Sequence, residues 1–253
     1  MLVDTHCHIF RDYYDDIESV IKRAKDAGIG AIIVNGVDRK SNEEILELVK
    51  KYDIVYGALG IQPEEVSKCK DDDLDFIEKH INDDKIVALG EIGLDYHYAC
   101  DKELQKKVFL KQLDIAKKYN KTVIVHSRDC INETYNILKD YNLKGIMHCY
   151  SGSIEMARKF NEIGFLLGIG GIATFKNAVK IVDVIKNIDL EYIVVETDSP
   201  YLSPEPYRGK KNEPKNIKNI VDKICEIKGL ESTFVCDVLV SNVCSLFDKQ
   251  IDL

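Results

Sequence analysis

The sequence predicts an α/β protein with the architecture of a (β/α)8 barrel, the TIM barrel. Short apolar runs alternate with amphipathic segments of helical spacing eight times along 253 residues. The apolar runs are continuous rather than alternating, which is typical of parallel strands that are covered on both faces. Eight such units fit the roughly 250 residues of a typical closed barrel, and a doubly wound open sheet is the alternative.

The predicted strands are short apolar runs that stop at glycine, asparagine or charged residues. We expect the fourth strand to end at Gly90, with residues 93–95 turning the chain away from it. The eight runs are residues 1–4, 31–34, 54–59, 86–89, 122–125, 145–147, 165–169 and 192–195.

The predicted helices carry apolar residues three and four positions apart. Ser41 is expected to cap the second helix, with Glu44 three residues on as its capping-box partner. Three aspartates, residues 71–73, precede the third helix and suit the positive end of its dipole. The segments are residues 15–27, 41–49, 74–81, 102–119, 131–138, 154–163, 178–188, 217–227 and 233–247.

Composition sets limits on organisation and location. No composition shift or low-complexity tract marks a boundary, so one domain over residues 1–253 is expected. The net charge of −8 argues against a protein that coats nucleic acid through a global positive field, although a local basic groove stays compatible with it. The sequence shows no signal-like start and no apolar run of membrane length. None of its eight cysteines, Cys100 included, forms a Cys-x-x-Cys pair. We therefore expect a cytoplasmic protein with no membrane and no evident obligate protein partner.

Six residues of metal-ligating type follow the predicted strands. The first two form a His-x-His pair, whose side chains point the same way from an extended chain. Because the carboxyl ends of all barrel strands meet at one rim, these groups are expected to converge there. The six are His6, His8, Glu91, His126, His148 and Asp198.

Six ligands suit two divalent ions better than one, and we expect Glu91 to lie between them. Imidazole nitrogens favour Zn, Mn or Ni, while Mg, which prefers oxygen, stays open. Any one strand-end histidine is more often a structural group. The joint arrangement on one rim is what predicts a metal site.

Seven ordered motifs resemble the TatD family of metal-dependent deoxyribonucleases, over residues 4 to about 247. They are DTHCH (4–8), GEIGLDY (90–96), VIVHSRD (123–129), HCYSG (148–152), GIGGIATFKNA (168–178), VVETDSPYL (194–202) and RGKKNEP (208–214). The resemblance implies a (β/α)8 barrel of the amidohydrolase-like type. It also implies that His6, His8 and Asp198 hold one ion, that His126 and His148 hold the other, and that Glu91 bridges both.

By the same resemblance, the expected activity is hydrolysis of phosphodiester bonds in DNA, as a 3′→5′ exonuclease on single-stranded ends. A water between the two ions would be the nucleophile, with Glu91 bridging and Asp198 as the general base. Arg128 and Arg208 are the expected phosphate contacts, because guanidinium groups suit phosphate oxygens. Tyr96, Tyr150 and Tyr201 are candidates for stacking on a base.

One position departs from the family pattern. Family members usually have His-Pro after the third strand, whereas this chain has Gly60-Ile61-Gln62-Pro63. Gln62 can hydrogen-bond to a substrate but cannot take up a proton. Either the reaction is slower or uses another substrate, or Gln62 supplies an equivalent donor.

Two alternative functions stay open on the sequence alone. The first is a hydrolase of a small amide, ester or phosphoester on the same barrel. The second is a non-catalytic protein that binds metal or nucleic acid, which an intact ligand set argues against.

Overall fold

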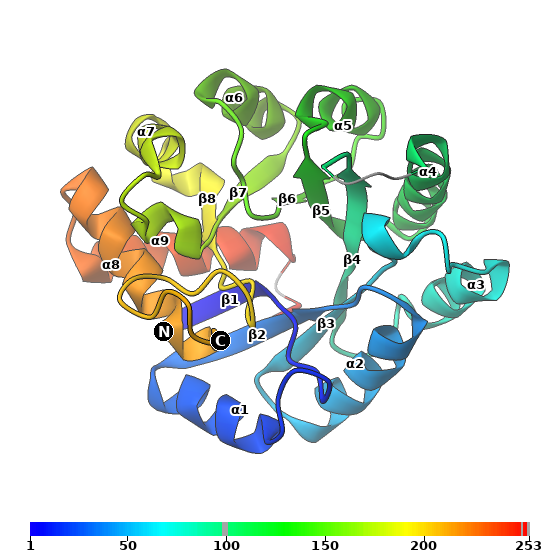
Figure 1. The fold of residues 1–253 in the computed structure, drawn as a ribbon, viewed down its shortest axis with the longest axis horizontal. Helices are drawn as coiled ribbons and strands as arrows, with labels where there is room; N and C mark the ends of the chain where they lie inside the picture. Colours follow the sequence, from blue (N-terminus) through cyan, green and yellow to red (C-terminus); the bar gives the residue numbers. More distant parts are fainter. Residues whose placement is uncertain (98–100, 249, 252–253) are drawn as a thin grey trace.

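The fold is a closed barrel of parallel strands surrounded by helices (Figure 1). The computed structural model describes residues 1–97, 101–248 and 250–251, so Cys100 lies outside the described residues. Within this part, eight strands pair in chain order, and β8 lies against β1, where Thr5 Oγ1 donates to the carbonyl of Val195 at 3.0 Å. The strands are β1 (Leu2–Cys7), β2 (Ile29–Asn35), β3 (Val55–Leu59), β4 (Ile86–Asp95), β5 (Thr122–Arg128), β6 (Gly145–Met147), β7 (Phe165–Ile169) and β8 (Ile193–Val195).

Helices α1 to α8 surround the barrel, and four short 3-10 turns among the described residues lie in the connections between strands and helices. The α-helices are α1 (Ile17–Asp26), α2 (Arg39–Lys51), α3 (Asp71–His80), α4 (Lys102–Tyr119), α5 (Ile131–Leu138), α6 (Ile154–Glu162), α7 (Val179–Asn187), α8 (Ile217–Lys228) and α9 (Ser232–Leu246). The 3-10 turns are η1 (Pro63–Glu65), η2 (Gly171–Thr174), η3 (Leu190–Tyr192) and η4 (Pro214–Asn216). The (β/α)8 prediction is confirmed.

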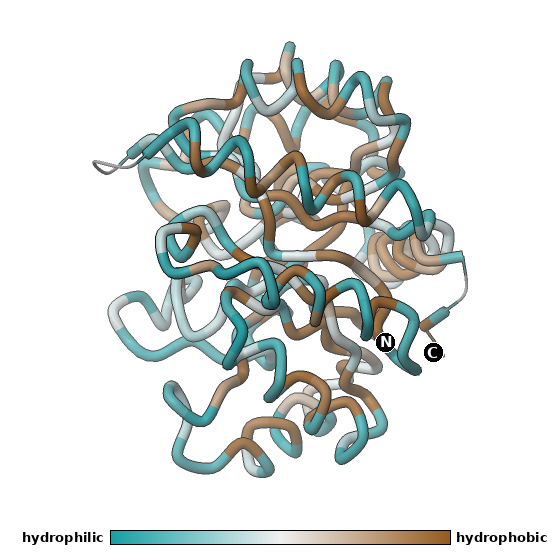
Figure 2. The backbone as a smooth tube through the Cα atoms, turned by 90° about the vertical axis from the view of Figure 1, so that its right-hand side faces the viewer, coloured by the Kyte–Doolittle hydropathy of each residue, from teal (hydrophilic) through white to brown (hydrophobic). Residues whose placement is uncertain are grey.

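Side chains alternate along each strand between two cores. In β2, Ala31 and Ile33 point into the barrel, while Ile32 and Val34 face the surrounding helices. Figure 2 shows the hydrophobic residues concentrated along the interior of the molecule and hydrophilic ones on its outside.

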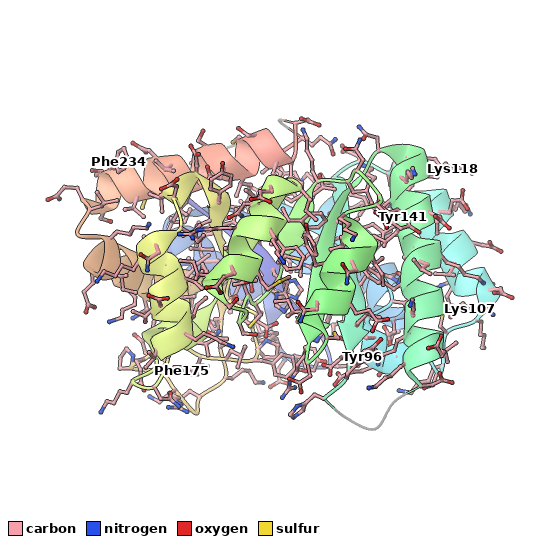
Figure 3. All side chains as sticks on the ribbon, turned by 90° about the horizontal axis from the view of Figure 1, so that it is seen from above. Tyr96, Lys107, Lys118, Tyr141, Phe175 and Phe234 are labelled. Carbon is pink, nitrogen blue, oxygen red and sulfur yellow. The ribbon has the colours of Figure 1, made fainter. Side chains whose placement is uncertain are left out.

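Helix α9 closes the amino end of the barrel. Its residues Val243 and Leu246 join the inner core, and Asn242 donates to the carbonyl of Ile193 at the start of β8. Figure 3 shows Phe234 of α9 at one end of the molecule and Tyr96 and Phe175 at the other. The carboxyl rim of the strands is therefore the end left for a site.

The prediction that the fourth strand ends at Gly90 is wrong. β4 continues to Asp95 and pairs with β5, with a register shift between Leu89 and Ile92. The two glycines that resemble turn signals permit a close approach of β5 instead. A Cβ on Gly93 would lie 2.0 Å from the carbonyl oxygen of His126, and one on Gly90 would lie 2.8 Å from Ile124 Cβ.

The predicted cap of the second helix is also wrong. Asp38 is the N-cap of α2 and accepts a hydrogen bond from the backbone N–H of Ser41 at 2.8 Å. Ser41 Oγ accepts in return from the N–H of Asp38, so Ser41 is the third-position partner of the box. Glu44 accepts from the backbone N–H of Arg11 instead, which ties the β1–α1 loop to α2. Other predicted ends differ by a few residues, as is usual at frayed ends.

None of the described helices is by itself long and apolar enough to cross a membrane. One pair, Pro214–Lys228 with Ser232–Leu246, is bent by 113° and reaches that length and apolar character only when taken together.

Candidate metal centre

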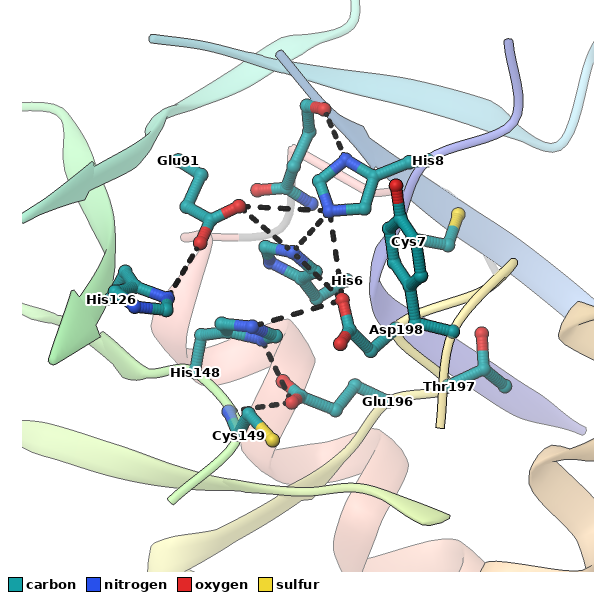
Figure 4. Close-up of polar contacts among 12 residues, drawn as sticks. His6, Cys7, His8, Glu91, His126, His148, Cys149, Glu196, Thr197 and Asp198 are labelled. Carbon is teal, nitrogen blue, oxygen red and sulfur yellow. Dashed lines mark hydrogen bonds and ion pairs between the residues drawn. The ribbon is translucent and has the colours of Figure 1, made fainter. Parts of the chain in front are cut away.

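The six predicted ligands converge at the carboxyl rim of the barrel (Figure 4). His6 lies in β1 and His8 just beyond it, while His148 follows β6 directly. Glu91 and His126 lie within β4 and β5 rather than after them, because both strands run further than the apolar pattern suggested. Asp198 lies three residues beyond β8.

The segment that carries Asp198 is fixed from both sides by buried polar groups. Asp4 of β1 is fully buried and accepts from the N–H of Thr197 at 2.9 Å and from its hydroxyl at 2.6 Å. The amide of Asn212, also fully buried, donates to the carbonyl of Thr197 at 2.9 Å. The N–H of Asp198 donates to the carbonyl of His6, which sets this carboxylate beside the His-x-His pair.

Four donor atoms lie close to one another, with separations typical of metal ligands. They are Nε2 of His6, Nε2 of His8, Oε2 of Glu91 and Oδ1 of Asp198, and five of their six separations run from 3.1 to 3.7 Å. A cation bound at about 2.0–2.2 Å to four tetrahedral donors holds them about 3.3–3.6 Å apart. The donor set therefore fits a divalent cation.

The other oxygen of Glu91 faces a different histidine. Oε1 lies 2.9 Å from Nδ1 of His126, on the opposite side of the carboxylate from His6 and His8 (Figure 4). Nε2 of His148 lies 3.8 Å from Oδ1 of Asp198, and the His148 ring stacks on that of His6 with centroids 3.5 Å apart.

The described residues also include three groups of three residues of metal-ligating type whose donor atoms lie within 4.8 Å of one another and could hold an ion. They are His6 with Glu91 and His148, His6 with His8 and Asp198, and His148 with Cys149 and Asp198. His126 belongs to none of these groups, so the expected pair of His126 and His148 is less compact than the first set. The thiol of Cys149, the residue after His148, belongs to the third group.

Carboxylates and a carbonyl behind the ligands orient three of the imidazoles, and they were not among the predicted site residues. Asp95 Oδ2 accepts from Nε2 of His126 at 2.9 Å, and Glu196 Oε1 lies 2.8 Å from Nδ1 of His148. Nδ1 of His8 donates to the carbonyl of Asn35 at 2.9 Å. Such partners leave the other nitrogen free to face a metal. Glu196 directly follows an apolar strand, and the same signal that singled out Glu91 could have identified it.

The electrostatics of the cluster favour bound positive charge. Burial opposes ionisation of Glu91, but hydrogen bonds from His126 and His6 hold its pKa well below the usual range. Burial also disfavours charge on His126, yet its bonds to Asp95 and Glu91 raise its pKa to about 10. The pKa of His148 is raised to about 9 against the same burial, by the charges of Glu196 and Asp198. Without metal, both imidazoles are therefore protonated at neutral pH, and a metal ion must displace one proton from each to bind there.

The pKa of His6 moves the other way, to about 4, because of burial and the neighbouring charge of His148. His6 Nδ1 is buried and has no hydrogen-bond partner among the described residues. A neutral imidazole in the middle of the cluster is the form that binds a metal.

The predicted substrate contacts are not all brought together. Gln62 and Arg128 line a cavity of about 570 Å³ at the rim, together with five of the six predicted ligands. Arg208 does not line it, and its guanidinium lies 4.3 Å from the centre of the Phe175 ring instead. Tyr150 is buried, with its hydroxyl donating to the carbonyl of Ser153 at 2.6 Å.

Comparisons with known proteins agree with this geometry. Residues 3–248 match the model of a family described as TatD related DNase. The uncharacterized metal-dependent hydrolase YabD of Bacillus subtilis is 39% identical over 252 residues, which cover 98% of this chain and 99% of that one. The uncharacterized metal-dependent hydrolase MJ1582 of Methanocaldococcus jannaschii is 38% identical, with 98% of both chains covered. The crystal structure of YjjV, a TatD homolog from Escherichia coli K12, superposes with a TM-score of 0.93 at 33% identity over 98% of both chains. This chain therefore belongs to the TatD family of metal-dependent hydrolases.

Proposed function

We propose that the protein is a deoxyribonuclease that uses two divalent ions, Mg, Mn, Zn or Ni, to hydrolyse phosphodiester bonds at single-stranded DNA ends in the 3′→5′ direction. The family description supports DNA as the substrate. The barrel and the ligand cluster support metal-dependent hydrolysis.

The observation that carries the proposal is the two-sided position of Glu91. Its Oε2 lies 3.5 Å from Nε2 of His6 and 3.6 Å from Nε2 of His8, while its Oε1 lies 2.9 Å from Nδ1 of His126. A carboxylate with one oxygen facing the His-x-His pair and the other facing His126 is suited to join two ions. His6, His8 and Asp198 would hold one ion, and His126 and His148 the other.

The roles of this chain's own groups follow from their positions. When bound, two ions supply Lewis acidity and lower the pKa of a bound water. Asp198 Oδ1 lies between three of the imidazole nitrogens, within 3.8 Å of each, and is placed to accept the proton of the attacking water. Arg128 lines the same cavity and would hold a phosphate oxygen, and the amide of Gln62 would donate a hydrogen bond without transferring a proton.

The size of the cavity and the net charge of the protein support an unpaired end as the substrate. A cavity of about 570 Å³ is in the range of small-molecule pockets, which suits a nucleotide or two and not a duplex. The net charge of −8 leaves the protein without a global attraction for long nucleic acids. Engagement of a chain end at the metal centre is the mode that these features favour.

We also propose that the chain is one domain and works in the cytoplasm. The seven described cysteines are all free thiols, which suits a reducing compartment.

The test is the product ladder of a single-stranded oligonucleotide labelled at either end, after metal removal and addition of Mg, Mn or Zn. We expect stepwise shortening from the 3′ end with metal, and none with chelator or with Glu91→Ala. Digestion by metal-free protein, or turnover of small amides, esters or phosphoesters in place of DNA, would contradict the proposal.

A further inference from the structure

We propose that Tyr201 is a stacking platform for the unpaired base next to the scissile bond, an inference that rests on the proposed nuclease function. Of the three tyrosines near the rim, it is the one both open to solvent, at 49% exposed, and in the lining of the metal-site cavity. Tyr150 is buried, and the hydroxyl of Tyr96 donates to Glu133 at 3.1 Å with Lys102 lying over its ring.

Tyr201 stands beside the metal centre. Its ring centroid lies 6.3 Å from that of His8, and its backbone N–H donates to the carbonyl of Asp198 at 2.8 Å. A flat group resting on this ring would therefore lie next to whatever His8 and Asp198 hold. The base of the nucleotide whose phosphate is being cleaved is the part of the substrate that reaches this position.

The platform is held in place before any ligand arrives. The Tyr13 ring meets the Tyr201 ring edge to face at 5.8 Å. The carbonyl of Tyr201 accepts from the buried amide of Asn212 at 2.8 Å, and the same amide holds Thr197. Little side-chain or loop freedom is left to lose on binding, so the stacking energy is retained as affinity.

The cavity has two chemically different walls. Tyr201, Leu202 and Ile172 form an apolar wall on the side of β7 and β8, and Arg128 stands on the wall of β5. In the closed barrel, β6 and β7 lie between β5 and β8, so the two walls are on different sides of the cavity (Figure 1). This pairing of an aromatic wall with a guanidinium matches a nucleotide, which has an apolar face on its base and charge on its phosphate.

The platform would act as a filter for unpaired ends. A base inside a duplex is stacked on its neighbours and cannot cover Tyr201, whereas a terminal unpaired base can. Stacking on an aromatic ring is sequence-tolerant, so no base preference is expected.

The test combines enzyme and substrate changes. Tyr201→Ala should lower kcat/KM on a single-stranded oligonucleotide about 5- to 150-fold, mainly through KM, while Tyr201→Phe stays within about twofold. On an oligonucleotide whose terminal residue is abasic, wild type should already show this loss and Tyr201→Ala should add nothing. Equal losses on ordinary and abasic substrates, or wild type that ignores the abasic end, would overturn the proposal.

Two controls distinguish loss of stacking on Tyr201 from a folding defect and from failure of the nuclease proposal. Tyr207→Ala removes a tyrosine of the same loop that is 39% exposed and does not line the cavity, and it should match wild type. If wild type cleaved no DNA, the nuclease proposal would fail. The platform would then be decided by binding of the holoprotein to a phosphorothioate oligonucleotide with terminal 2-aminopurine. Fluorescence should be quenched by wild type and not by Tyr201→Ala, and the absence of quenching with wild type would refute the platform.

Discussion

Replacing Glu196 by glutamine should weaken the ion held by His148 and leave the other ion in place. Oε1 of Glu196 lies 2.8 Å from Nδ1 of His148 and accepts from the N–H of Cys149 at 2.6 Å, and the side chain is fully buried. A glutamine keeps the shape but removes the negative charge that orients the imidazole and raises its basicity.

The size of the effect follows from the 2.8 Å ion-pair contact between Oε1 of Glu196 and Nδ1 of His148, since glutamine carries no charge. Loss of such an outer partner typically costs about 10- to 100-fold in metal affinity. That loss corresponds to about 1.4–2.7 kcal/mol of binding free energy.

The assay is metal competition against a chelator, which resolves a tight and a weak ion per chain. We expect one dissociation constant of Glu196→Gln to rise about 10- to 100-fold and the other to stay within about threefold. Glu226→Gln, at an exposed carboxylate on α8, is the matched control. Two unchanged dissociation constants in a folded Glu196→Gln protein would refute the orienting role.

Three further predictions concern the same centre. His126→Ala should empty one ion and leave the other, because His126 faces Oε1 of Glu91, whereas His6 and His8 face Oε2; metal analysis showing either two ions or none would contradict this. In metal-free protein the pKa of His126 is about 10 and that of His148 about 9, both above the 6.5 of a free imidazole. The two protonated imidazoles therefore stabilise the folded protein fully below pH 6.5, and this contribution is lost as the pH rises through 9 to 10. Metal must displace these protons at pH 7, so calorimetry in buffers of different ionisation enthalpy should show proton release, and zero release would exclude charged imidazoles. Gln62→His should raise kcat severalfold if proton transfer at this position limits the reaction, and an unchanged kcat would mean that Gln62 is an equivalent donor.

The features of the fold and of the site that local sequence patterns determine could be predicted. Continuous apolar runs and helical spacing carry the barrel, and the His-x-His pair places His6 and His8 on one side of an extended chain whatever the rest of the fold does. Once the barrel is accepted, its geometry brings the distant strand ends to one rim.

Features that depend on strand register and packing could not be predicted from the sequence. Gly90 and Gly93 look like a turn, and only the close approach of β5 explains them as part of a strand. Asp38 and Ser41 are both good capping residues, and the loop before α2 decides between them.

The outer partners and the proposed stacking residue could not be predicted either, because they depend on tertiary contacts. Asp95 and Glu196 become partners of His126 and His148 through strand pairing that no spacing rule encodes. Tyr150 and Tyr201 are equivalent by pattern, and only burial separates them.

The central claim is that Glu91 joins two ions, and metal analysis of wild type beside Glu91→Gln tests it most directly. Wild type freed of metal, reloaded and desalted should hold two divalent ions per chain, because the two oxygens of Glu91 face different histidine sets. Glu91→Gln should hold at most one ion after desalting, and chelator competition should show weakened binding at both sites. Two tightly held ions in Glu91→Gln, or a single ion in wild type at saturating metal, would contradict the shared-carboxylate centre.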